Sequence, residues 1–72
     1  MPESESIQVV VNGKALSFAH GTRLPEVVKS LHLKPSNVVT ERNEEALTQS
    51  EAATVTVEDG DRIEIVQIVA GG

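Results

Sequence analysis

The chain has 72 residues and no cysteine, so it has room for one domain and none for disulfides, thiolate metal sites or catalytic thiols. Its net charge of −5 is uneven: residues 1–40 carry four Lys or Arg against three acids, and residues 41–72 carry two against eight. An acidic second half argues against nucleic-acid binding, which requires clustered Lys and Arg. No apolar run is long enough to span a bilayer, so we expect no membrane partner and a cytoplasmic location.

The first third of the chain predicts a β-hairpin. Residues 7–11 are rich in β-branched side chains, and residues 15–18 alternate between apolar and polar. Between them, Asn12-Gly13 favours the positive φ angles of a type I′ turn. We expect residues 1–5 to form a flexible tail in front of this hairpin.

A single amphipathic helix is predicted after Gly21. Thr22 is suited to cap its first turn, and Pro25 is tolerated there because no intrahelical donor is lost. Pro35 prevents the helix from continuing much beyond Leu33. The spacing i, i+3, i+4, i+7 places four apolar residues on one face: Leu24, Val27, Val28 and Leu31.

The second half predicts two strands around a short helical turn. Residues 38–41 form a short strand, Asn43 suits a turn, and residues 50–53 are placed in a helical turn. Residues 62–69 are rich in β-branched side chains, as is typical of a central strand: Ile63, Ile65, Val66, Ile68 and Val69.

The order of these elements predicts an α+β architecture. A hairpin cannot bury its apolar face alone, so the one main helix must pack across one face of the sheet. With the last strand parallel to the first, this is a β-grasp, or ubiquitin-like, fold with a mixed sheet of four to five strands. Residues 6–69 form the domain, and residues 70–72 form a flexible C-terminal tail.

The last strand changes its pattern partway along. Ile63 and Ile65 share one face, whereas Val66 and Ile68 lie on the face of Glu64. Because the helix covers only one face, two interpretations remain open. Either Val66 and Ile68 are exposed for a partner to bind, or a bulge shifts the register and buries Ile68.

The tail carries the candidate chemistry. Gly71 and Gly72 lack side chains, so they form a thin thread that can enter a narrow cleft and leave the terminal carboxylate open to attack. That carboxylate needs activation, for instance adenylation by ATP on a partner enzyme. A sulfur donor could then displace AMP and leave a thiocarboxylate. The other interpretation is that the two glycines are only a frayed end.

Other polar residues offer little. His20 and His32 stand alone, and the acids at residues 44–45 and 58–61 belong to turns, where acids are mostly solvated. We therefore predict no metal site and no bound cofactor. The small size and the single aromatic residue, Phe18, argue against an enzyme.

Four short stretches carry a family resemblance: Asn12-Gly13, residues 38–43, residues 59–66 and residues 69–72. In order and spacing they resemble the ThiS family, the sulfur carrier proteins of thiamine biosynthesis, which have a ubiquitin-like β-grasp fold. The resemblance covers the chain from residue 7 to residue 72. Glu44, Thr48 and Ala52 depart from it, since the family commonly has a Gly, a Pro and an aromatic residue at or near these positions.

The resemblance implies a carrier that acts as a co-substrate of other enzymes. Gly72, with Gly71 beside it, would be adenylated by a ThiF-type enzyme that uses ATP, and a sulfur donor protein would convert it to a thiocarboxylate. A ThiG-type thiazole synthase would take the sulfur. The residues that the resemblance implies for partner contact are Val66, Ile68, Val69 and Ala70.

Two alternatives share this tail. Sulfur carriers for molybdopterin synthesis, tRNA thiolation or amino-acid sulfur assimilation end in the same way, although the molybdopterin carrier often has prolines just before its glycines and residues 67–70 have none. A ubiquitin-like modifier would instead link Gly72 to lysines of other proteins.

Overall fold

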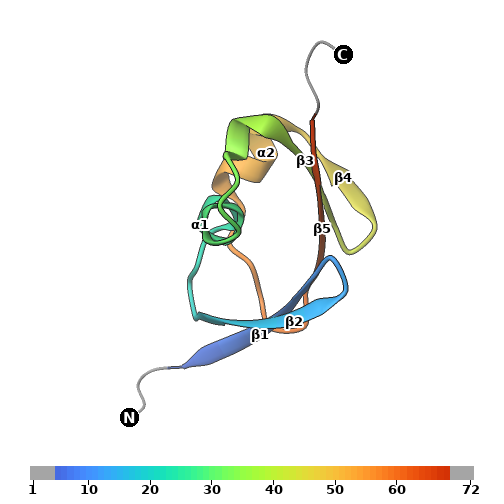
Figure 1. Cartoon of the computed structure of the whole chain (residues 1–72). Coiled ribbons are helices and arrows are strands. Elements are labelled where there is room, and N and C mark those ends of the chain that lie inside the picture. Colours follow the sequence, from blue (N-terminus) through green and yellow to red (C-terminus); the bar gives the residue numbers. More distant parts are fainter. Residues whose placement is uncertain (1–4, 69–72) are drawn as a thin grey trace.

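A five-stranded mixed sheet with helices on one side organises the chain (Figure 1). The computed structural model describes residues 5–68. The C-terminal tail predicted at residues 70–72 and all but the last residue of the N-terminal tail predicted at residues 1–5 lie outside the described residues. In chain order the elements are β1 (Ser6–Val11), β2 (Lys14–Ala19), α1 (Leu24–Ser30), the 3₁₀ turn η1 (Pro35–Asn37), β3 (Val38–Arg42), β4 (Glu45–Leu47), α2 (Gln49–Thr54) and β5 (Arg62–Gln67).

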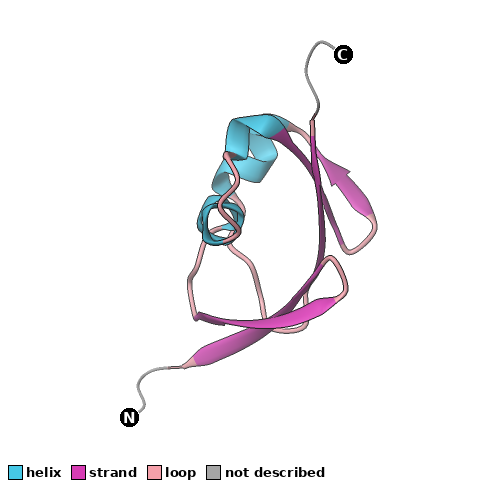
Figure 2. Cartoon of the chain, in the orientation of Figure 1, coloured by secondary structure: helices cyan, strands magenta, loops and turns pink. Residues whose placement is uncertain are grey.

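The strand order is β2-β1-β5-β3-β4, which confirms the predicted β-grasp sheet. The first and last strands, β1 and β5, are parallel at the centre, and every other pairing is antiparallel. Both helices lie on the concave side of the curved sheet, as Figure 2 shows. The opposite, convex side of the sheet carries no helix among residues 5–68 and is called the outer face below.

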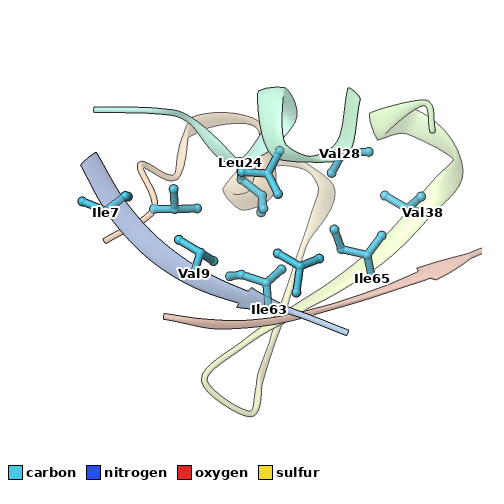
Figure 3. Close-up of a cluster of buried hydrophobic side chains, with 10 residues drawn as sticks. Ile7, Val9, Leu24, Val28, Val38, Ile63 and Ile65 are labelled. Atoms are coloured by element: carbon cyan, nitrogen blue, oxygen red, sulfur yellow. The ribbon is translucent and has the colours of Figure 1, made fainter. Parts of the chain in front are cut away.

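The hydrophobic core fills the space between α1 and the sheet (Figure 3). β1 and β5 contribute alternate residues from below, and α1 contributes its apolar face from above, as predicted. Leu24, Val9, Val27 and Ile63 are at most 1% exposed. The complete set of buried apolar residues is Ile7, Val9, Val11, Leu24, Val27, Val28, Val38, Val57, Ile63 and Ile65.

The predicted cap of α1 is wrong. The N-cap residue is Arg23, and no side chain caps the helix. The hydroxyl of Thr22 instead donates to the carbonyl of Ala19 at 2.6 Å, closing the turn that follows β2. Pro25 does lie in the first turn, as predicted.

α1 ends at Ser30 in a Schellman motif centred on His32. The N–H of His32 donates to the carbonyl of Lys29, and the N–H of Leu33 to that of Val28. His32 has φ 63°, a left-handed conformation that glycine most often occupies at this position. The helix therefore stops before Pro35 could terminate it.

The segment between β3 and β5 is more regular than its sequence indicates. β4 pairs with β3 through a turn in which Asn43 and Glu44 both have positive φ, 51° and 71°. Sequence reasoning placed the turn at Asn43 but missed the three-residue strand after it. α2 begins in a capping box, in which Thr48 and Glu51 each bond the other's backbone N–H. The predicted helical turn at residues 50–53 is thus a six-residue helix.

Candidate functional site

An apolar patch lies on the outer face where β5 leads toward the tail. It consists of Val39, Val66 and Ile68, whose side chains are 48%, 62% and 47% exposed. Val39 and Val66 are direct cross-strand partners in the β3–β5 ladder. We call these three residues the outer patch. Val39 was not predicted, although its place after inward-facing Val38 in a period-two strand was a usable signal.

The register and exposure of β5 decide between the two interpretations of its pattern. The register with β3 runs without interruption from Arg42↔Ile63 to Val38↔Gln67, so no bulge shifts the strand. Ile63 and Ile65 face the core at 1% and 6% exposure, while Val66 faces away from it. The exposed interpretation is confirmed for Val66 and Ile68. Whether they bind a partner stays a prediction, and Val69, Ala70, Gly71 and Gly72 lie outside the described residues.

Two acids of the second half, Glu41 and Glu64, adjoin the outer patch. Glu41 and Glu64 are direct cross-strand partners, one rung along the outer face from the pair Val39 and Val66. Like charges placed directly opposite each other repel and destabilise a sheet slightly. The arrangement therefore favours a partner surface that has an apolar centre and basic groups at its rim.

Asp61, directly before β5, fixes the start of that strand. It is 6% exposed, and its carboxylate accepts hydrogen bonds from the backbone N–H of Glu58 at 2.9 Å, from Nδ2 of Asn43 at 3.1 Å and from Nε of Arg42 at 2.9 Å. Burial opposes ionisation, but these three donors and the charge of Arg42 outweigh it and lower the pKa of Asp61. Sequence reasoning treated Asp61 as a solvated turn acid, and that is wrong.

Asn12 supports β5 along the edge that faces β1. Its Oδ1 accepts from the N–H of Ile65 at 2.8 Å, and its Nδ2 donates to the carbonyl of the same residue at 3.2 Å. The side-chain amide thus replaces a peptide group and extends the pairing beyond the last rung of β1 and β5, Val11↔Ile63. The sequence identified Asn12 only as a turn residue.

Within residues 5–68, no three His, Cys, Asp or Glu side chains come together in a way that could hold a metal. A pocket of about 310 Å³ opens between α1 and α2 and is lined mainly by apolar groups, including Leu24, Val28, Val38 and Ala52. Across the described part of the chain, no helix has the length and apolar character needed to cross a membrane.

These features define a small ubiquitin-like β-grasp domain with an exposed apolar patch beside its C-terminal strand. The chain belongs to the ThiS family, whose family model matches residues 3–72 and thus includes both terminal glycines.

Two relatives match this chain over their full lengths. The crystal structure of a thiamine biosynthesis protein, ThiS from Geobacter metallireducens, has 31% sequence identity and a TM-score of 0.70, covering 92% of this chain and 100% of that one. The sulfur carrier protein ThiS of Escherichia coli K12 is 27% identical over 66 residues, which are 92% of this chain and 100% of that protein.

A longer relative is also similar. A thiazole synthase of Paramagnetospirillum magneticum is 33% identical over 66 residues. This match takes in 92% of this chain, but the chain spans only 20% of the length of that synthase. A segment of that enzyme is thus similar in sequence to most of this chain.

Proposed function

We propose that this chain is a sulfur carrier protein of thiamine biosynthesis that holds sulfur as a thiocarboxylate on Gly72. The observation that carries the proposal is the ThiS family match through residue 72, together with similarity over the full length of a ThiS sulfur carrier. The carrier serves as a co-substrate of its partner enzymes.

The chemistry requires two enzyme-catalysed steps before sulfur is delivered. On a ThiF-type enzyme, the carboxylate of Gly72 attacks the α-phosphate of ATP, which forms an acyl adenylate and releases pyrophosphate. Sulfur at the sulfide level, delivered by a donor protein, then attacks the acyl carbon, so that the acyl C–O bond breaks, AMP leaves and a C–S bond forms, which gives the thiocarboxylate. On a ThiG-type thiazole synthase this C–S bond breaks as sulfur passes to the thiazole precursor, and an oxygen atom from water or from the precursor takes its place and regenerates the carboxylate. ATP is used on the activating enzyme.

The described residues support this role by leaving β5 accessible next to the tail. The outer patch exposes two apolar side chains, Val66 and Ile68, within six residues of Gly72. Burying them on a partner is favourable at about 25 cal/mol per Å² of apolar surface. The carboxylates of Glu41 and Glu64 add attraction to a basic rim.

The similarity to a thiazole synthase supports a thiazole synthase as the acceptor. The chain is similar to a segment of such an enzyme, which supports the proposal that a domain of this kind acts together with a thiazole synthase. That similarity favours thiamine biosynthesis over the other pathways in which carriers of this type act. The use of ATP by the activating enzyme is consistent with a cytoplasmic location, which stays a prediction.

Reconstitution tests the proposal. The chain is combined with a ThiF-type enzyme, ATP, a sulfur donor and a ThiG-type synthase, and thiazole product is measured against a variant lacking Gly72. We expect product with the intact chain and none with the shortened one. Product at equal rates from both would contradict the proposal, as would covalent linkage of the chain to lysines in place of product.

A further inference from the structure

The two edges of β5 are used differently. In an antiparallel ladder, successive residues direct their backbone N–H and C=O groups to opposite sides. The N–H of Ile68 donates to the carbonyl of Asn37 at 2.8 Å. The backbone N–H and C=O groups of the even-numbered residues in β5 therefore point toward β3. The backbone groups of the odd-numbered residues point toward β1. The carbonyl of Asp61 accepts from the N–H of Val10, and the carbonyl of Ile63 accepts from the N–H of Asn12.

β1 does not extend as far as β5 does. Its last rung with β5 is Val11↔Ile63, after which the chain turns away at Asn12-Gly13. The side chain of Asn12 satisfies the next odd residue, Ile65, at both its N–H and its carbonyl. The following odd residue is Gln67, which is exposed and has no pairing strand on this side among residues 5–68.

Gln67 therefore presents an open sheet edge beside the outer patch. Its N–H and C=O lie in the plane of the sheet, while Val66 and Ile68 project from the outer face on either side of it along the chain. An unpaired N–H and C=O at a strand edge form a template for another extended chain. Backbone pairing of this kind gives affinity, and the flanking apolar side chains give specificity.

We propose that the thiazole synthase that receives the sulfur adds an extended segment to β5 at the Gln67 edge. This inference rests on the proposed function and names how the acceptor binds. In the complex, the backbone N–H and C=O of Gln67 pair with that segment five residues before Gly72.

Backbone recognition suits the composition of the tail. Gly71 and Gly72 offer a partner no side chain to grip, so their orientation must come from main-chain contacts or from the walls of a cleft. Edge pairing supplies main-chain contacts that start on a rigid strand. The segment that pairs with Gln67 is thereby fixed relative to the core of the carrier.

Hydrogen exchange measures the pairing directly. By NMR, the amide of Gln67 is followed in the free chain and in its complex with the synthase. We expect rapid exchange in the free chain and exchange slowed at least about tenfold in the complex, as for one added hydrogen bond. Unchanged exchange of Gln67 in a formed complex would overturn the inference, as would failure to form the complex.

A backbone variant gives the second readout. Gln67→Pro removes the N–H, which takes no part in the β3 ladder, so the fold should be retained. Gln67→Thr is the matched control, because it changes the side chain and keeps the N–H. We expect Gln67→Pro to weaken synthase binding about tenfold and Gln67→Thr to leave it within about twofold. Equal binding by both variants, or a loss shared by both, would overturn the inference.

Two further outcomes distinguish edge pairing with the synthase from the proposed function and from self-association of the chain. If the chain forms a thiocarboxylate and yields thiazole while Gln67 stays unprotected, edge pairing fails and the proposed function stands. If Gln67 is protected without enzyme, in a manner that depends on the concentration of the chain, then a second copy occupies the edge and the inference is wrong. Should Gln67→Pro unfold, the exchange measurement on the unmodified chain decides.

Discussion

Removal of the Asp61 carboxylate should destabilise the domain more than any other single change in its turns. Asp61→Ala deletes three hydrogen bonds to a buried anion, each contributing about 1.5 kcal/mol or more. The loss is reduced where donors can rehydrate, since the side chain of Arg42 is 28% exposed and Asn43 is exposed. We therefore expect a loss of about 2–4 kcal/mol from a total stability of about 4–11 kcal/mol for 72 residues.

Urea unfolding followed by circular dichroism measures this loss. Asp59→Ala is the matched control two residues away, because the Oδ1 of Asp59 accepts only one hydrogen bond, from the N–H of Gln8 at 2.8 Å, at an exposed site. We expect the control to cost less than about 1 kcal/mol. An Asp61→Ala variant no less stable than Asp59→Ala would refute the view that Asp61 anchors β5.

The same carboxylate should make stability depend on pH. The pKa of Asp61 is lower in the folded chain than its ordinary value, so the folded state favours the ionised form. The stabilisation is present above the unfolded pKa of about 3.9 and is lost as pH falls through the folded pKa. Unfolding free energies measured from pH 6 downward should fall more steeply for the unmodified chain than for Asp61→Asn. Parallel curves would refute the assignment.

Three further changes test other parts of the fold. Glu44→Gly should stabilise by about 0.5–1 kcal/mol in urea unfolding, since Glu44 holds φ 71°, whereas Glu44→Ala should not. Asn12→Gly keeps the positive φ but loses both bonds to Ile65, so it should cost about 1–3 kcal/mol; no loss would show those bonds to be dispensable. The double change of Val66 and Ile68 to Asp should lower the melting temperature only modestly, since both side chains are exposed, and should weaken binding to the activating enzyme more than tenfold. A collapse in melting temperature would contradict their exposure.

The sequence predicts this fold well where local and global signals agree. Asn12-Gly13 predicts the first hairpin because few residue pairs tolerate two positive φ angles. The apolar face of α1 and the apolar face of β5 each need a partner surface to bury them. Packing the helix across one face of the sheet buries both. The change of pattern at Val66 correctly located the exposed side of β5, although the sequence alone left burial of Ile68 possible.

What the sequence does not reveal depends on contacts between distant residues. Thr22 has the chemistry of a cap, but its hydroxyl closes the preceding turn instead. β4 has only three residues, too few for a period-two pattern to register. Asp61 resembles a solvated turn acid because its partners Arg42 and Asn43 lie almost twenty residues earlier, and Asn12 reaches Ile65 across 53 residues.

Intact-mass spectrometry tests the central claim most directly. The chain is incubated with ATP, a ThiF-type enzyme and a sulfur donor, and its mass is compared with that of a sample lacking ATP. A thiocarboxylate on Gly72 predicts a gain equal to the difference between one sulfur and one oxygen atom, located by fragmentation in the last residue. An unchanged mass with active partner enzymes, or the same gain in a chain lacking Gly72, would contradict the account.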